Sequence, residues 1–218
     1  MAKPQRATKL IIFDWDGTLS DSVARIARCI QLAAQEHQLP QPSFDQAKDI
    51  IGLGLREAVS QLFPSIDAAM VERFSASYSA EYRSQDNSPC EFFPGVLSSL
   101  QQLRDSGYRL AVATGKSRAG LNRVFQATEL GDFFHGSRCA DETRSKPHPM
   151  MLEELLFEQG VAPQDAVMVG DTEFDMAMAV NADMPRIAVS YGAHERNRLL
   201  EYQPIACLDQ FSNILKYV

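Results

Sequence analysis

Short apolar runs recur along the chain, and each of them ends at a glycine or a polar turn. Such runs contain β-branched side chains and are typical of strands buried on both faces of a sheet. They cover residues 9–13, 109–113, 166–169 and 186–189. Helical patterns lie between them, over residues 95–106, 117–128, 149–159 and 172–181. Strands that alternate with helices predict an α/β fold in which helices cover both faces of a parallel sheet.

The stretch from residue 21 to residue 91 breaks this alternation, because its pattern is helical throughout. Apolar residues first recur there at the spacing of one helix face, at Val23, Ile26, Ala27, Ile30 and Ala33. Further helices are predicted over residues 44–51, 55–63 and 67–84. The polar borders, near residues 20–22 and 85–89, suit hinges. The sequence therefore predicts a helical domain, residues 21–91, inserted into an α/β core of residues 1–20 and 92–218.

The composition indicates a globular chain without a strongly charged surface. Of 218 residues 45% are hydrophobic, and 21 basic against 28 acidic side chains give a net charge of −7. This balance does not attract nucleic acid or an anionic membrane, and no apolar run reaches the ~18 residues of a membrane span. The four cysteines form no CxxC pair, and the basic N-terminus lacks the apolar segment of a signal peptide. A reducing cytoplasm is expected, and the sequence does not distinguish a monomer from a dimer.

Two carboxylates mark the carboxyl end of the first predicted strand. Asp14 and Asp16 stand two residues apart, so the period of a strand points both to the same side. Ligands of open α/β sheets bind outside this edge. The two carboxylates repel each other unless a cation or a shared proton is present, and Mg²⁺ accepts one or two carboxylates together with a substrate phosphate. The alternative is that Asp16 and Gly17 only form a turn.

Two later segments carry groups that suit a phosphate. Thr114, Gly115 and Lys116 precede a predicted helix, where a hydroxyl and backbone N–H groups make a phosphate cradle. Otherwise Thr114 is only the N-cap of that helix. Lys146 begins a Lys-Pro-His-Pro segment, whose prolines hold it at the mouth of the next helix. Its ammonium is placed to pair with phosphate and with a carboxylate, and an exposed surface lysine is the alternative.

Carboxylates also follow the third apolar run, in the sequence GDTEFD. Asp171 is a candidate to complete a metal site, and Asp175 to support Lys146 or a metal-bound water from behind. Helix capping is the alternative for both, since acidic residues near a helix N-terminus are stabilising. Because all these segments directly follow predicted parallel strands, they are expected to meet at one edge of the sheet.

Four motifs together resemble the haloacid dehalogenase superfamily of phosphohydrolases. They are DWDGTLSDS at residues 14–22, ATGK at 113–116, SKPHP at 145–149 and GDTEFD at 170–175, in the family's order. The resemblance extends over nearly the whole chain and implies a Rossmann-like core with an inserted helical cap. Gly115 stands where Asn is common in relatives, a departure that touches only the backbone cradle.

The resemblance also implies a role for each motif residue. Asp14 attacks phosphorus, while Asp16 protonates the leaving oxygen and then activates water. Thr114 and Lys146 hold the transferring phosphoryl group, with the backbone at Gly115 completing the cradle. Mg²⁺ is bound by Asp14, the backbone carbonyl of Asp16 and Asp171.

These roles imply a Mg²⁺-dependent phosphatase for a small phosphorylated metabolite, similar to phosphoglycolate phosphatases. A pyrophosphatase is an alternative, and so is a phosphomutase, which keeps a phosphorylated sugar bound while the cap excludes water. A 2-haloacid dehalogenase is disfavoured, because it needs no metal and is not expected to carry an acid at Asp16 followed by Gly-Thr. A binding role without catalysis is disfavoured as well, since none of the four motifs is lost.

One residue of the predicted cap is a candidate for substrate specificity. Arg56 follows Gly52-Leu53-Gly54-Leu55, which suits a flexible turn between two cap helices. The resembling family places specificity residues in this loop, and an arginine binds a carboxylate or a second phosphate bidentately. We therefore expect Arg56 to contact the part of the substrate that is not transferred, with a solvated surface arginine as the alternative.

Overall fold

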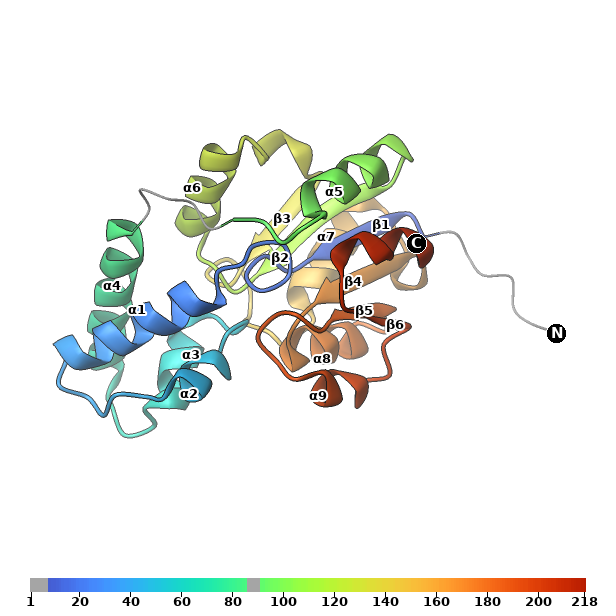
Figure 1. Ribbon diagram of the computed structural model, residues 1–218. Coiled ribbons are helices and arrows are strands. Elements are labelled where there is room, and N and C mark those ends of the chain that lie inside the picture. The colour runs from blue at the N-terminus through green and yellow to red at the C-terminus, as the bar shows by residue number, and fades with distance from the viewer. Residues whose placement is uncertain (1–7, 86–90) are drawn as a thin grey trace.

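The computed structural model describes residues 8–85 and 91–218, which form a sheet-based core with a helical cap beside it (Figure 1). Six strands of the core pair in parallel in the order β3-β2-β1-β4-β5-β6. Their bounds are β1 (Leu10–Phe13), β2 (Arg109–Thr114), β3 (Gly136–Cys139), β4 (Ala166–Gly170), β5 (Arg186–Val189) and β6 (Ala206–Leu208). The predicted α/β fold with a parallel sheet is confirmed.

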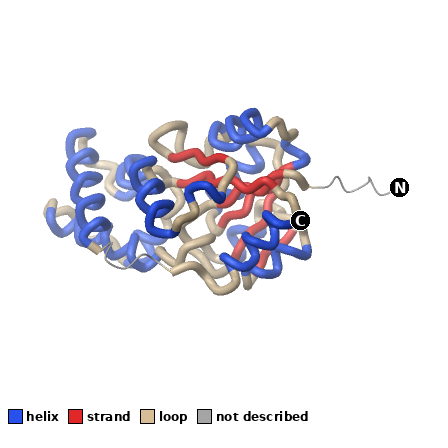
Figure 2. The backbone as a smooth tube through the Cα atoms, turned by 90° about the horizontal axis from the view of Figure 1, so that it is seen from above, coloured by secondary structure: helices blue, strands red, loops and turns tan. Residues whose placement is uncertain are grey.

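Helices cover both faces of the sheet, as the view from above shows (Figure 2). One face packs against α5 (Val96–Asp105), α6 (Arg118–Thr128) and the 3₁₀-helix η3 (Phe211–Lys216), and the other against α7 (Met150–Gln159), α8 (Glu173–Asn181) and α9 (Arg196–Leu200). Along β1, Ile11 and Phe13 enter the first apolar cluster, whereas Leu10 and Ile12 enter the second. All four are fully buried, which explains why this strand is a continuous apolar run.

Two edge strands, β3 and β6, were not predicted from the sequence. The four residues of β3 read GSRC and those of β6 read ACL, so one is polar and the other is too short to form a pattern. Of the cysteines that the structure describes, none forms a disulfide. Within residues 8–85 and 91–218, no helix combines the length and the apolar character of a membrane span.

In the described part of the cap there are four helices, α1 (Val23–Glu36), α2 (Phe44–Lys48), α3 (Leu55–Leu62) and α4 (Ala68–Ser84). They enclose an apolar cluster of their own, in which Ile30, Val59 and Phe74 are almost fully buried. The α2 helix ends at Lys48, three residues earlier than the pattern predicts. The second predicted border, near residues 85–89, lies mostly outside the described residues.

The two chain segments that join cap and core run side by side. The N–H of Asp21 donates to the carbonyl of Glu91 at 2.8 Å, and the N–H of Phe93 donates to the carbonyl of Leu19 at 3.0 Å. Ser20 and Phe92 form an antiparallel bridge between these contacts. The connections to the cap therefore form a short two-stranded ribbon.

Candidate functional site

The predicted site residues converge where three neighbouring strands, β2, β1 and β4, end. Asp14 follows β1, and its backbone N–H donates to the carbonyl of Val169 in β4 at 2.9 Å. Thr114 is the last residue of β2, and Asp171 directly follows β4. The sheet thus brings together residues that lie far apart in the sequence, at the edge where α/β folds bind ligands.

Lys146 lies fully buried between two carboxylates. Its Nζ is 2.6 Å from Asp14 Oδ1 and 2.7 Å from Asp175 Oδ1. Burial alone would lower the pKa of this lysine, but the charges of both carboxylates outweigh burial and raise its pKa above the ordinary value. Lys146 therefore remains an ammonium, and the alternative of an exposed surface lysine is wrong.

The two carboxylate oxygens of Asp175 have different partners. While Oδ1 contacts Lys146, Oδ2 accepts hydrogen bonds from the backbone N–H of Thr172 at 3.1 Å and from its hydroxyl at 2.7 Å. Thr172 is the N-cap of α8 and forms a capping box with Asp175. Asp175 thus caps α8, as the alternative had it, and also contacts Lys146; its support of Lys146 in catalysis stays a prediction.

Asp171 is buried and held by two other loops of the core. It accepts hydrogen bonds from the Thr18 hydroxyl and from the backbone N–H of Ala193, both at 2.7 Å. Burial and then the charge of Asp175 raise the pKa of Asp171 to about 7. A Cβ atom added at Gly17 would lie 2.2 Å from Asp171 Oδ2, so only glycine lets that turn approach the carboxylate.

The carboxylates at the strand ends fit a divalent cation. Oxygen atoms of Asp14, Asp171 and Asp175 lie within 4.8 Å of one another. Asp14 Oδ2 is buried without a hydrogen-bond partner, which leaves this oxygen for a cation. Burial raises the pKa of Asp14 well above its ordinary value. The Lys146 ammonium opposes this shift, and the charges of Asp175 and Asp171 add to it. Hard oxygen ligands of this kind suit Mg²⁺.

Asp175 and the predicted ligand Asp16 differ from Asp14 and Asp171 in how their carboxylates are placed. Both oxygens of Asp175 already accept hydrogen bonds, so this residue is better suited to orient Lys146 than to bind a cation. Asp16 was expected to bind the metal through its backbone carbonyl, which stays a prediction. Its side chain points elsewhere, because Oδ1 is 2.6 Å from the Ser22 hydroxyl and 2.9 Å from Lys116 Nζ.

The segment after β2 approaches the cap closely. Thr114 is fully buried, and its hydroxyl accepts a hydrogen bond from the Lys116 N–H at 3.2 Å. The alternative of Thr114 as an N-cap is wrong, because Ser117 caps α6. A Cβ atom at Gly115 would lie 2.5 Å from the carbonyl oxygen of Leu53 in the cap. The absence of a side chain at Gly115 therefore allows the cap to approach the core, so the departure from Asn does not concern the backbone cradle alone.

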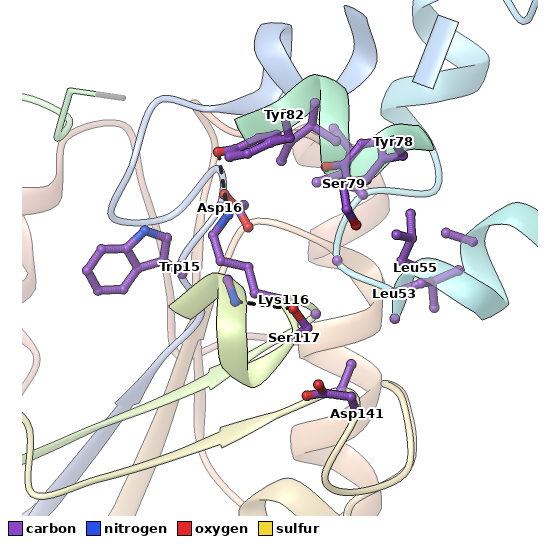
Figure 3. Close-up of a pocket in the computed structure, with 18 of the residues that line it drawn as sticks. Trp15, Asp16, Leu53, Leu55, Tyr78, Ser79, Tyr82, Lys116, Ser117 and Asp141 are labelled. Carbon is purple, nitrogen blue, oxygen red and sulfur yellow. Dashed lines mark hydrogen bonds and ion pairs between the residues drawn. The ribbon is translucent and has the colours of Figure 1, made fainter. Parts of the chain in front are cut away.

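A cavity of about 1000 Å³ lies between cap and core and opens beside Asp16 (Figure 3). Its core wall includes Lys116, Ser117 and Asp141, and its cap wall includes Leu53, Leu55, Tyr78, Ser79 and Tyr82. The mixture of apolar, hydroxyl and charged side chains is typical of a site for a small organic molecule.

Arg56 also lines this cavity, at the start of α3. Its side chain is 69% exposed, and Nη2 is 2.9 Å from Glu72 Oε2 of α4. The cavity wall thus holds the predicted specificity residue, already paired with an acidic neighbour. Its contact with a substrate stays a prediction.

The side chains of Lys116, Tyr78 and Tyr82 line the cavity but were not predicted to have a role. Lys116 belongs to the ATGK motif, and the tyrosines stand four residues apart in a predicted helix, so they share one helix face. These two signals were available in the sequence. The contact of Tyr82 with Lys116 was not, because it depends on how the cap packs on the core.

Comparisons with known proteins agree with this geometry. A family model described as haloacid dehalogenase-like hydrolase matches residues 11–189. The chain is 33% identical to the probable phosphatase IndB of Dickeya dadantii, over 94% of this chain and 91% of the relative. It is 30% identical to a phosphoglycolate phosphatase of Aliivibrio fischeri, over 95% of both chains. A solved structure from Haemophilus somnus, described as a predicted phosphoglycolate phosphatase, is 27% identical with a TM-score of 0.82, over 96% of this chain and 97% of that one.

Proposed function

Because the chain belongs to the family of haloacid dehalogenase-like hydrolases, we propose that it is a Mg²⁺-dependent phosphatase that removes phosphate from a small phosphorylated metabolite by way of Asp14. The family and the enzyme class, a phosphatase, are those predicted from the four motifs, and the comparisons confirm both. What we propose beyond this is the metal ion, the class of substrate and the role of each residue.

One observation carries this proposal, namely the state of the Asp14 carboxylate. Oδ1 is fixed by Lys146 at 2.6 Å, and Oδ2 is buried without a hydrogen-bond partner. A carboxylate held this way is oriented and poorly hydrated, which favours its attack on an electrophile. In the proposed first step, an oxygen of Asp14 forms a bond to phosphorus while the bond from phosphorus to the leaving oxygen breaks.

Asp16 supplies the proton that this step needs. It protonates the leaving oxygen, so that an alcohol departs and the phosphoryl group stays on Asp14. Asp16 then takes a proton from water, which attacks phosphorus and releases phosphate with Asp14 restored. Dividing the hydrolysis in this way replaces one very slow reaction by two faster ones.

The other motif residues hold the phosphoryl group during both steps. The Lys146 ammonium lies beside Asp14 and offsets negative charge on the phosphoryl oxygens. The Thr114 hydroxyl stands at the end of the neighbouring strand, where it is placed to donate to one of them. Mg²⁺, held by Asp14, Asp171 and the backbone carbonyl of Asp16, would neutralise further charge on these oxygens.

The identity of the substrate is proposed at the level of its class. The A. fischeri relative is named a phosphoglycolate phosphatase, which supports a small phosphorylated metabolite similar to phosphoglycolate. A panel of phosphorylated metabolites, with phosphate release measured in Mg²⁺, ranks candidates by kcat/KM. Release of phosphate from pyrophosphate would favour the pyrophosphatase alternative. Formation of an isomeric sugar phosphate would favour a mutase.

The test of the mechanism is Asp14→Asn. The amide keeps the size of the side chain but cannot attack phosphorus, so we expect turnover to vanish while the fold persists. Trapping of labelled phosphate on the protein should vanish too, as measured after an acid quench. Wild-type activity in a pure and folded Asp14→Asn protein would refute the proposed function.

A further inference from the structure

Lys116 stands at the junction of core and cap, where its ammonium contacts one acidic and one aromatic side chain (Figure 3). Nζ is 2.9 Å from Asp16 Oδ1, 3.5 Å from the Tyr82 hydroxyl oxygen and 4.8 Å from the centre of the Tyr82 ring. The side chains of Lys116 and Asp16 are each only 11% exposed, so water screens their interaction weakly. Asp16 belongs to the core, whereas Tyr82 belongs to the cap helix α4.

From this arrangement we infer that Lys116 positions the Asp16 carboxyl group for proton transfer, and that Tyr82 makes this positioning depend on a closed cap. The inference rests on the proposed function, in which Asp16 exchanges protons with the leaving group and with water. It adds two positioning residues: Lys116, whose side chain has no role in the motif that contains it, and Tyr82 of the cap, which lies outside the four motifs.

The contacts of Asp16 determine which of its oxygens transfers the proton. The Ser22 hydroxyl donates to Oδ1 at 2.6 Å, and Lys116 contacts the same oxygen at 2.9 Å. Two donors on one oxygen fix the rotation of the carboxyl group and leave Oδ2 to carry the proton. In the first step this proton moves from Oδ2 to the leaving oxygen as its bond to phosphorus breaks. In the second step Oδ2 takes a proton from the attacking water.

The ring of Tyr82 holds the ammonium in place from the cap side. A cation is attracted to the face of an aromatic ring within about 6 Å of its centre, and both Lys116 and Arg25 lie within that range of Tyr82. When the cap moves away from the core, Tyr82 leaves with α4 and Lys116 loses this contact. The proton-transfer geometry is therefore complete when the cap also excludes water from the site.

A different role for Lys116 would be to bind an anionic group of the substrate. The two roles predict different dependence on the leaving group. A positioning role matters most for a poor leaving group such as an alcohol, which needs a proton, and least for p-nitrophenolate, which departs without one. A binding role matters most for a substrate with a carboxylate, whatever its leaving group.

The experiment compares Lys116→Met with the wild-type enzyme in single-turnover measurements, which isolate transfer of phosphate to Asp14 from its later hydrolysis. The substrates are ethyl phosphate, p-nitrophenyl phosphate and phosphoglycolate. We expect the rate with ethyl phosphate to fall ~10- to 100-fold, part of the range of acid–base catalysis, and at least tenfold more than the rate with p-nitrophenyl phosphate. Equal losses on all three substrates, a loss confined to phosphoglycolate or no loss would overturn the inference.

Variants of Tyr82 test the part played by the cap. Tyr82→Phe keeps the ring face and should retain most of the rate, whereas Tyr82→Leu should show the same leaving-group dependence as Lys116→Met. Lys216→Met is a matched control, because Lys216 is exposed and contacts Asn213 far from the cavity. Thermal unfolding of each variant excludes loss of the fold, and a Tyr82→Leu enzyme with the wild-type pattern would remove Tyr82 from the proposal.

Two further variants separate this inference from the proposed function. Asp16→Asn should show the leaving-group dependence even if Lys116→Met does not, in which case Asp16 keeps its role and Lys116 loses the one assigned to it. If neither Asp14→Asn nor Asp16→Asn slows phosphate transfer, the proposed function itself is wrong.

Discussion

The side of the site that receives phosphate is closed and takes its charged groups from the core, whereas the side that faces the leaving group is built from two domains around a cavity. On the phosphate side, Asp14, Lys146 and Asp175 are at most 1% exposed. They are held by β1, by the segment before α7 and by the capping box of α8. The charged contacts among these three residues involve the core alone, and the cap approaches this side through its backbone, where the Gly54 N–H donates to the Ser145 hydroxyl at 2.7 Å.

The leaving-group side depends on the cap at several points. Lys116 contacts Tyr82 of α4, and the backbone at Gly115 meets Leu53 in the cap. Cap helices also supply much of the cavity wall. The charged groups around Asp14 therefore lie in the core, and those that face the leaving group lie between the domains, so mutations should affect the two sides separately.

The largest effect should come from breaking the phosphate side with Lys146→Met. Removal of the ammonium leaves the carboxylates of Asp14 and Asp175 buried without their partner. Loss of one member of a buried ion pair costs ~3–5 kcal/mol of stability, so the free energy of unfolding in urea should fall by that amount and activity should disappear on every substrate.

A matched control is Lys9→Met, because Lys9 pairs with Asp165 at 3.0 Å but its side chain is 63% exposed. An exposed pair contributes at most ~1 kcal/mol. Equal destabilisation by the two substitutions would contradict the contrast between the buried site and the surface.

The next effect concerns the metal. Chelation should abolish activity and Mg²⁺ should restore it, with Ca²⁺ a poor substitute because it favours more ligands and longer bonds. Asp171→Ala should raise the Mg²⁺ concentration for half-maximal activity by at least ~10- to 100-fold, the scale of changes around a metal site. Calorimetric titration with Mg²⁺ gives a readout that does not need turnover.

Asp165→Ala is the control for this prediction, because Asp165 is also buried but lies at the other end of β4 beside Lys9. Its Mg²⁺ requirement should stay that of the wild type. Full activity in excess chelator would argue against the metal site and in favour of the dehalogenase alternative.

A smaller and selective effect is expected from Arg56→Ala on the leaving-group side. It should cost ~1.5–3 kcal/mol in kcat/KM for an anionic metabolite, the scale of a charge-assisted hydrogen bond, and leave p-nitrophenyl phosphate nearly unaffected. Glu72→Gln sharpens the test, because it releases Arg56 from its ion pair and should improve use of the anionic substrate.

Arg73→Ala is the control, since Arg73 is an exposed arginine of the same cap. Equal losses on both substrates in Arg56→Ala would indicate a destabilised cap. No loss on either would indicate that Arg56 is a solvated surface arginine without a substrate contact.

The smallest effect should come from Gly115→Ala. The added Cβ would lie 2.5 Å from the Leu53 carbonyl oxygen, so the cap must shift to close. Overpacking of this kind costs ~1 kcal/mol at the low end, and it should reduce kcat/KM similarly for all substrates. Gly131→Ala is the control, because its Cβ would meet no atom closer than 3.8 Å. A change in substrate preference would show that Gly115 contacts the substrate.

The core and its motif residues could be predicted because local patterns determine them. The buried strand before Asp14 is recognisable from its apolar run, and the carboxyl ends of parallel strands must share one edge. Asp14, Thr114 and Asp171 were therefore expected to meet before any distance was known. The burial of Lys146 could not be predicted in the same way, since it depends on one carboxylate after β1 and another in the first turn of α8.

Contacts between the domains could not be predicted from the sequence. Whether Tyr82 reaches Lys116 depends on the angle at which α4 approaches the core, and no periodicity within α4 reports that angle. Arg56 shows the same limit, because its pairing with Glu72 joins two helices whose relative placement is set by the apolar cluster of the cap. Edge strands such as β3 were missed because half-buried residues carry little pattern.

The ribbon that joins cap and core has a mechanical consequence. Two hydrogen-bonded segments, anchored where Asp21 meets Glu91 and Phe93 meets Leu19, bend readily across the flat face of the ribbon but resist sliding within its plane. The cap is thereby restricted to a hinge rotation about essentially one axis. Each closure then returns the end of α4 to the same place on the core, which a contact between positioning residues of two domains requires.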